Sequence, residues 1–530
     1  MEKVIPYLIM LIPYLITLIP FGIALLIMML HARKRGAIVQ GVRTASHLLS
    51  IALAYILAPI ASRTVAESFI GAEGIDLSQI FAELNFVIPG DTGIPAVLAG
   101  FISPVMFFVL WVLIGIAFAI VYAIVRKIIV HAQKEKEIGK GSKAIALALA
   151  FVTAFAVGAT FTMPVVGTMR VISETAANVA VVEYEMRKES VGGDVDGAEV
   201  VFDFIREVDS NVTFKAVDAT TGWMFDGLTT IEYLGEKGSI AKDLPKVANG
   251  INGMVGSVTE LMSALQGSSD ISKVDLSAME RIATYIDQTP TSRIFGCVLM
   301  RTAASAVSDM KEQDPDNEAA GFYDVIVEHF SKSTPQMVAT DNENFYRAFV
   351  ILQKTYILVD EINQPSSSEQ GAVDQMGQIF DTLTPGSATI ATDLLLAAVD
   401  TGALNIGDFD MNALGGTIGD VFIAMSEARE TLGEAEYRQE VEVFTNILDF
   451  IVTQADEAAH KVVSGICNSE VISSVLKDAL EKYGSDPYGL GAALSEEQKR
   501  NISSFVQEHK NLGEDEAKLD MILQIFGIQG

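Results

Sequence analysis

Long uncharged segments dominate the first third of the chain. Residues 4–30 hold no charged side chain, and a helix of this length rises about 40 Å at about 1.5 Å per residue, which exceeds the roughly 30 Å hydrocarbon core of a bilayer. Similar segments occur at about 45–62, 94–125 and 144–166. Backbone groups within lipid must be hydrogen-bonded inside the segment, so each is expected to be a helix. The pattern predicts four spans, with the lipid bilayer as their surroundings.

Beyond the fourth segment, apolar positions recur with a helical period. Phe345, Phe349 and Leu352 fall at steps of four and three within 342–362, and the same spacing recurs within 436–452. Such a pattern gives each helix one apolar face, which packs against neighbouring helices. The predicted fold class is therefore all-α, a four-helix transmembrane bundle followed by a large α-helical region.

Local signals predict where several of these helices begin. Ser495 and Gln498 have the spacing of a capping box, in which each side chain satisfies a free backbone N–H at the helix start. Proline near a first helical turn predicts two further starts, at Pro290 and Pro385. Alternating strand patterns are scarce, although residues 200–217 allow a β-hairpin.

A polar stretch rich in serine and glutamine, residues 363–375, is the best candidate for a linker. It divides the helical region into two lobes and gives three predicted domains, 1–166, 167–364 and 365–530. The alternative is that the same stretch is a long loop within one domain.

Charge is segregated between the membrane region and the rest. Residues 1–166 carry 12 basic and 8 acidic side chains, whereas residues 167–530 carry 25 and 59, which leaves the chain at −30 overall. An acidic region of this size repels nucleic acid and anionic membrane surfaces, and it attracts cationic peptides and metal ions. We therefore expect no nucleic-acid partner.

The basic residues between the spans predict the topology, because Lys and Arg are retained on the cytoplasmic side. Four of them follow the first span without an acidic residue, and six lie between the third and fourth spans. The loop between the second and third spans has only Arg63 against five acidic residues. We therefore expect the N-terminus and residues 167–530 to be extracytoplasmic. The topology-determining residues include Arg33, Lys34, Arg35, Arg43, Arg126 and Lys127.

The first span contains Pro6, Pro13 and Pro20, which lie seven residues apart and so share one face of a helix. An interior proline removes a backbone donor and bends the helix. These helix-bending residues either free carbonyl groups toward a polar path or curve the span against its neighbours.

Small residues recur at four-residue intervals in the later spans and predict helix-packing faces, because they let backbones approach closely in lipid. The partner of such a face is either another span or a second copy of the chain, which would make a homo-oligomer. The residues are Gly115, Ala119, Ala146, Ala150, Ala154 and Gly158.

The sequence contains no recognisable catalytic or metal motif. It lacks a P-loop, a nucleophile elbow, a zinc-binding His-Glu-x-x-His helix and a Cys-x-x-Cys pair. No acidic residue or histidine lies in the middle of a span, which disfavours a proton-coupled carrier. The histidines outside the spans, His329, His460 and His509, are too dispersed to predict a metal cluster. We therefore expect no catalytic, cofactor-binding or metal-binding residue, and no enzyme.

Two weaker features concern metal and thiol chemistry. Asp408, Asp410 and Asn412 have the alternate spacing of a calcium loop, but the glycine and the acidic residue that such a loop needs further on are missing. Cys297 and Cys467 lie among apolar helix residues and are expected to be buried free thiols, with a disulfide as the alternative.

The membrane third resembles the colicin V production protein (CvpA) family. The likeness rests on RGAIVQGVRTASHLLSIALAYILAPI, residues 35–60, and on GKGSKAIALALAFVTAFAVG, residues 139–158, which are similar to the family's basic turn, second span and entry to the last span. It covers roughly 160 of the 530 residues. The resemblance implies a role in producing or secreting a toxin-like peptide, or in envelope maintenance.

Three functions are compatible with these observations. The first is a CvpA-like bundle that displays a helical module to bind an envelope or secreted protein. The second is a channel or transporter in which the proline-bent first span lines a path and the outer region forms a cap. The third is a membrane-tethered enzyme without a recognisable motif. The absence of charge within the spans favours the first over an ion-coupled carrier.

Overall fold

The structure is a computed structural model, and almost all of its ordered secondary structure is helical. It describes residues 5–32, 36–70, 75–76, 87–88, 93–132, 139–189, 210–247, 280, 285–313, 320–362, 369–400, 411–453 and 456–528. The prediction of an all-α protein is confirmed for these ranges, which hold 17 α-helices and two short antiparallel strand pairs.

The chain forms two compact units that are not contiguous in sequence. The first unit consists of residues 1–252, 284–302 and 334–336, and the second of residues 253–283, 303–333 and 337–530. Helix α9 (Pro290–Gln313) contributes residues to both. The predicted boundary at residue 166 lies inside helix α4, and residues 363–368 of the predicted linker lie outside the described residues.

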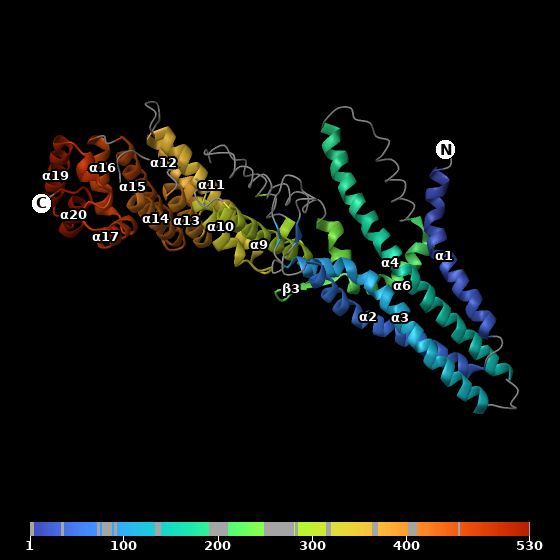
Figure 1. Cartoon of the computed structure of the whole chain (residues 1–530). Coiled ribbons are helices and arrows are strands. Elements are labelled where there is room, and N and C mark those ends of the chain that lie inside the picture. Colours follow the sequence, from blue (N-terminus) through green and yellow to red (C-terminus); the bar gives the residue numbers. More distant parts are fainter. Residues whose placement is uncertain are drawn as a thin grey trace. The chain divides into compact units, whose positions relative to one another are not determined.

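The first unit contains the apolar helices, which are drawn in blue to green in Figure 1. Helices α2, α3 and α4 are long and apolar enough to cross a membrane, whereas the apolar part of α1 found among the described side chains, Leu18–Ala32, is shorter. Three membrane helices are therefore supported directly. The helices are α1 (Ile5–Ala32), α2 (Ala37–Ile70), α3 (Ile94–Ala132) and α4 (Lys140–Glu189).

Large apolar side chains on these helices face outward. Ile56, Val105 and Ile116 are 62%, 63% and 56% exposed, and in water such a surface would be costly. Burial inside the unit is instead provided by Ala54 and Ala58 of α2 together with contacts from α3 and α4. This distribution is typical of helices that face lipid, where small residues mediate packing between helices.

Helix α2 packs along α3, and α1 packs along α4. After α4 the chain forms α6 (Val212–Leu228), whose first turn is capped by Asn211: its side-chain oxygen accepts a hydrogen bond from the Phe214 amide at 2.9 Å. The hairpin that residues 200–217 allow does not form where the structure describes them, because α6 occupies that segment from Val212 onward.

A hairpin instead follows α6. Strands β3 (Thr230–Tyr233) and β4 (Glu236–Ser239) pair antiparallel, and they are joined by Leu234 and Gly235, which have φ angles of 45° and 85°. Two consecutive left-handed residues form the tight turn that matches the twist of a hairpin. A second, shorter pair joins β1 (Ile75–Asp76) to β2 (Val87–Ile88).

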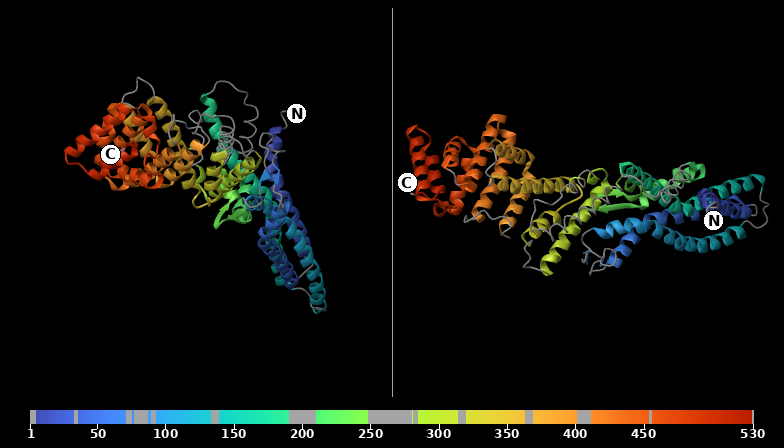
Figure 2. Two further views of the ribbon diagram at one scale, coloured as in Figure 1. Left: turned by 60° about the vertical axis from the view of Figure 1, so that its left-hand side comes forward. Right: turned by 90° about the horizontal axis from the view of Figure 1, so that it is seen from above.

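The second unit is a bundle of helices, drawn from yellow to red in Figure 2. The predicted starts are confirmed: α9 begins at Pro290, α13 begins at Pro385, and Ser495 and Gln498 form the capping box of α19. The helices are α10 (Ala320–Ser331), α11 (Val338–Ile362), α12 (Glu369–Thr382), α13 (Pro385–Asp400), α14 (Met411–Thr431), α15 (Glu434–Thr453), α16 (Asp456–Asn468), α17 (Val471–Tyr483), α18 (Leu490–Ala493), α19 (Glu496–Asn511) and α20 (Glu516–Ile525).

The predicted apolar stripe of α11 forms part of this unit's core. Phe345, Phe349 and Leu352 are at most 2% exposed, and the two phenylalanine rings lie 5.0 Å apart between centroids. Phe380 of α12 contacts Phe444 of α15 in the same way, at 5.5 Å. Each fully buried side chain of this kind contributes about 1.5–3 kcal/mol, so the second unit has a hydrophobic core of its own.

Candidate functional site

The predicted topology residues lie at the ends of the apolar helices. Arg43 is in the second turn of α2, and Arg126 and Lys127 are in the last two turns of α3. The other three, at positions 33 to 35, lie outside the described residues. Helix α1 continues without a break through the three prolines at positions 6, 13 and 20.

A hydrogen bond joins the start of α2 to the start of α4. The backbone amide of Ala37, at the start of α2, donates to Ser142 Oγ near the start of α4 at 2.9 Å. Further along, the hydroxyl oxygens of Thr44 and Thr153 are 2.8 Å apart. Helices α2 and α4 therefore run parallel from adjacent starting points.

The small residues of α4 face α1 of the same chain. Ala146, Ala150 and Ala154 are fully buried, and the last two pack in a cluster with Met28 and Ala32 of α1. A Cβ atom added at the next residue of this face, Gly158, would lie 3.1 Å from the Cα atom of Phe21. On α3, Gly115 has no atom within 4 Å of an added Cβ, and Ala119 is exposed.

An ion cluster joins α4 to α6 beyond the apolar stretch. The Arg170 guanidinium donates to Asp218 Oδ1 at 3.2 Å and also to the Asp226 carboxylate. All three side chains are less than one-third exposed. Two carboxylates around one guanidinium fix the position of α6 against α4, because charge-assisted hydrogen bonds are directional and strong.

A groove lies between α17 and α20 in the second unit. Its volume is about 570 Å³, and its lining carries both signs of charge together with apolar side chains. The lining residues that point to a binding role are Glu470, Ser473, Lys477, Asp515, Lys518 and Met521. The lining thus combines charged and apolar side chains, as ligand-binding sites commonly do.

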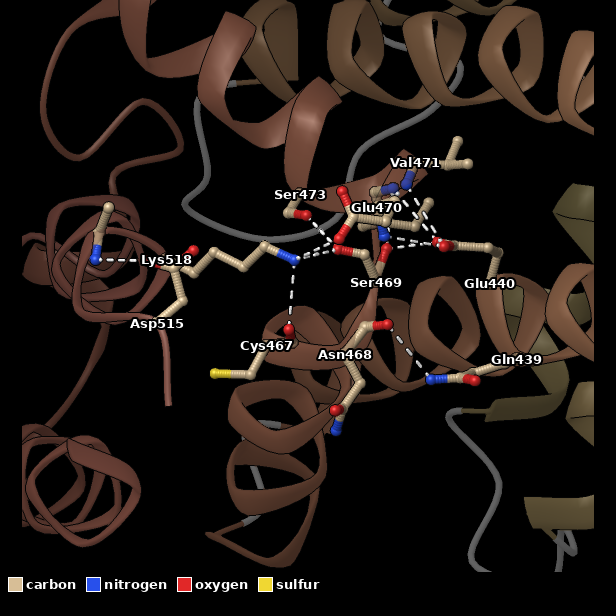
Figure 3. Close-up of polar contacts among 12 residues, drawn as sticks. Gln439, Glu440, Cys467, Asn468, Ser469, Glu470, Val471, Ser473, Asp515 and Lys518 are labelled. Atoms are coloured by element: carbon tan, nitrogen blue, oxygen red, sulfur yellow. Dashed lines mark hydrogen bonds and ion pairs between the residues drawn. The ribbon is translucent and has the colours of Figure 1, made fainter. Parts of the chain in front are cut away.

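Glu440 of α15 fixes one wall of this groove. The side chain is 5% exposed, and its carboxylate accepts hydrogen bonds from the backbone amides of Glu470, Val471 and Ile472 at 2.9, 3.3 and 3.3 Å and from the Ser469 hydroxyl (Figure 3). These amides are the unpaired donors at the start of α17. A carboxylate there satisfies them and interacts favourably with the helix dipole.

Lys518 fixes the other wall. Its ammonium group on α20 donates to the backbone carbonyls of Cys467 and Ser469 at 3.2 and 2.8 Å (Figure 3). Glu470 lies 3.3 Å from the same nitrogen. The cation thus binds the free carbonyl groups at the end of α16, where the helix dipole is negative, and links three helices at one point.

The same region brings together three side chains that could bind a metal ion and that no sequence motif connects. Cys467, His509 and Glu514 each offer one ligand atom, and these atoms lie within 4.8 Å of one another. The histidines alone are too dispersed to predict a metal cluster, but His509 lies close to a thiol and a carboxylate. The spacing gives no signal for it, because Cys467 is 42 residues from His509 and the tertiary fold alone brings them together.

The remaining candidates give a mixed result. Both cysteines are free, Cys297 is buried and Cys467 is half-buried, so the expected free thiols are confirmed and full burial holds only for the first. Asp408 and Asp410 of the calcium-like fragment lie outside the described residues, and the third residue, Asn412, lies in the first turn of α14.

Comparisons of this chain with models of protein families, with curated proteins and with solved structures find no match.

Proposed function

We propose that this chain is a four-span membrane protein that holds its acidic helical region outside the cytoplasm and binds an envelope or secreted polypeptide there. The observation that supports this proposal most is the structural difference between the two units. The first unit has span-length helices with outward apolar side chains, and the second has its own core and a groove of mixed charge.

The order of the helices supports the membrane arrangement. Residues 5–30 of α1 carry no charge, and the 28 residues of α1 would extend about 42 Å, so α1 is long enough to be the fourth span. The contact between Ala37 and Ser142, which joins the starts of α2 and α4, supports an arrangement in which both helices enter the membrane from the same side. Retention of basic residues in the cytoplasm then assigns that side to the cytoplasm and the far end of α4 to the outside.

The groove supports the binding role. Lys477 is exposed, and Glu470 at the groove edge has a 90% exposed side chain, so the polar groups of the rim are accessible to a partner. The excess of acidic residues beyond position 166 attracts a cationic segment over longer distances, and such steering raises association rates. A secreted peptide with basic residues and a short apolar stretch would be attracted by the acidic region and would fit the mixed lining of the groove.

The resemblance to the colicin V production protein family adds a biological setting to this proposal. It concerns residues 35–60 and 139–158, which correspond to most of α2 and to the beginning of α4. On this basis the partner belongs to the production or secretion of a toxin-like peptide, or to maintenance of the envelope. The acidic helical region is the part of the chain that goes beyond the family's membrane unit.

Site-specific photo-cross-linking in intact cells tests the proposal. A photoreactive amino acid replaces Lys477 in the groove or, as a control, Lys482, which is also exposed on α17 but does not line the groove. We expect a discrete cross-linked polypeptide from position 477 and none from position 482. The groove would not be the binding site if both positions gave the same products, or if neither gave any.

A further inference from the structure

Three chemically different ligand groups converge where α16, α19 and α20 meet. Cys467 lies in the last turn of α16, His509 in the last turn of α19, and Glu514 in the turn between α19 and α20. A thiol from one stretch thus meets an imidazole and a carboxylate from another, and their ligand atoms lie within 4.8 Å of one another. The tertiary fold, rather than one flexible loop, positions this group.

The backbone of the turn places Glu514 toward His509. Gly513 has a φ of +82°, the left-handed conformation that glycine adopts without strain after a helix. The chain thereby reverses, and the Glu514 amide donates to the His509 carbonyl at 3.3 Å. Asp515 then caps α20 by accepting from the Ala517 amide at 2.9 Å. The Gly-Glu-Asp sequence ends one helix, presents a carboxylate and starts the next helix.

Two buried polar atoms of this group, one on His509 and one on Glu514, contact each other without good hydrogen-bond geometry. His509 is 7% exposed, and its Nδ1 atom lies 2.9 Å from Glu514 Oε2. Despite this distance, neither atom has a partner of hydrogen-bond geometry among the described residues. Buried polar atoms are stabilised by well-oriented partners, so an additional group that binds both atoms would improve their pairing.

A nucleophilic triad of cysteine, histidine and glutamate is the first chemical alternative, and the electrostatics oppose it. Burial, and next the hydrogen bond and negative charge of Glu514, raise the pKa of the Cys467 thiol to about 12. Catalytic cysteines need the opposite, a pKa lowered by nearby positive charge or a helix N-terminus. Cys467 instead lies at a helix C-terminus and next to a carboxylate, the opposite of what a nucleophilic thiol needs.

We propose that Cys467, His509 and Glu514 are the protein ligands of a zinc ion. Zinc is bound by sulfur, nitrogen and oxygen at about 2.0–2.3 Å, and three protein ligands leave a fourth position for water or an external ligand. Ligand atoms around a tetrahedral zinc ion lie about 3.3–3.8 Å apart, and those here all lie within 4.8 Å of one another. This proposal does not depend on the partner-binding role proposed above.

The surrounding charges are compatible with a divalent cation. The groups that face the thiol are Glu514 and Asp515, which are acidic, His509, and Lys518. The Lys518 ammonium opposes a cation, but it is held by the carbonyls of Cys467 and Ser469 and by the Glu470 carboxylate. It therefore orients the backbone of the thiol ligand rather than pairing with Glu514. Binding must displace the thiol proton, because the thiolate is the form that binds metal.

Metal titration of the full-length protein in detergent tests this site. The protein is stripped with a chelator and titrated with Zn²⁺ in competition with a chromophoric chelator, and with Co²⁺, whose thiolate complexes absorb in the near ultraviolet. The variants are Cys467→Ser and the conservative Glu514→Gln. His329→Gln is the matched control, because His329 Nε2 also lies 2.9 Å from a carboxylate, that of Asp393, elsewhere in the second unit.

We expect the unaltered chain to bind one zinc ion and to release a proton, measured by calorimetry in two buffers of different ionisation enthalpy. Cys467→Ser and Glu514→Gln should each weaken binding at least about tenfold, since loss of even an outer-shell partner costs about 10- to 100-fold. Cys467→Ser should also lose the thiolate absorption with Co²⁺, and His329→Gln should behave as the unaltered chain.

The proposal would be overturned by zinc binding that is equal in the unaltered chain and both ligand variants, by equal loss in His329→Gln, or by no binding in any protein. Zinc should also raise the melting temperature of the unaltered chain but not of Glu514→Gln. Since Glu514 is near the surface and the glutamine is isosteric, this variant keeps the test decisive if Cys467→Ser fails to fold.

Discussion

Glu440 is a single side chain that holds together two helices far apart in sequence. Its carboxylate binds the start of α17 through three backbone amides and the Ser469 hydroxyl, across a separation of 29 to 32 residues. A hydrogen bond to a charged group contributes about 1.5–3 kcal/mol to stability, and bonds that share one carboxylate do not add. The wall of the groove therefore depends on this carboxylate.

Replacement of Glu440 by alanine should lower the free energy of unfolding of the second unit by about 2–4 kcal/mol, because several buried donors lose their acceptor. Glutamine retains one carbonyl acceptor and should cost less. Glu442→Ala, an exposed position on the same helix, should change stability by no more than about 0.5 kcal/mol. Pulse proteolysis in urea measures all three, and equal stability of the Glu440→Ala and Glu442→Ala variants would refute the assigned role of Glu440.

Residue roles could be predicted from sequence only where the interaction is local. The capping box of Ser495 and Gln498 spans three residues and was predicted correctly. Glu440 and the group of Cys467, His509 and Glu514 depend on contacts that helix packing creates across 29 or more residues. In a chain with 67 acidic residues, composition cannot single out these two carboxylates.

Among the elements, the pair formed by α1 and α4 shows how small residues determine packing. The buried face of α4 places Ala150 and Ala154 against Met28 and Ala32, and Gly158 lets the backbone of α1 approach at Phe21. The partner of this face thus lies within the same chain. Close backbone approach is how helices associate in lipid, where no hydrophobic force drives them together.

Gly158→Ile should therefore loosen the bundle. Its Cβ atom alone would lie 3.0–3.1 Å from Phe21 atoms, and overpacking of this kind costs about 1–3 kcal/mol. Gly115→Ile is the matched control, because nothing lies within 4 Å of a Cβ atom there. Thermal unfolding in detergent should show a lower melting temperature for the first variant alone. Unchanged melting of Gly158→Ile, or an equal fall in both, would contradict the packing described.

Helix starts were predictable at the level of elements, whereas the hairpin was not. Proline at 290 and 385 marks the start of α9 and of α13 by a local steric rule. The hairpin turn places Leu234 at a φ of 45°, a conformation that leucine rarely adopts. Because the usual Asn-Gly or Asp-Gly signal is absent there, the sequence alone does not indicate a turn.

For the whole molecule, the segregation of charged and apolar residues predicts an apolar membrane region and an acidic helical region, but it does not predict the boundaries between the two units. Residues 284–302 belong with the membrane helices although they lie more than a hundred residues beyond the last span. Composition along the chain cannot show that residues 284–302 belong to the first unit, because contacts between distant segments decide which unit a segment joins. The overall class was predictable because lipid and water impose opposite patterns on the two regions.

Accessibility of single introduced cysteines in intact protoplasts measures the membrane arrangement most directly. The positions are Glu497 on α19 and Lys140 at the start of α4, both exposed, and a membrane-impermeant thiol reagent labels whatever faces outward. The native thiols give little background, because Cys297 is buried and the pKa of Cys467 is raised to about 12 by its surroundings. We predict labelling of Glu497→Cys in intact protoplasts and of Lys140→Cys only after lysis. Labelling of Lys140→Cys in intact protoplasts, with Glu497→Cys protected until lysis, would contradict the proposed topology.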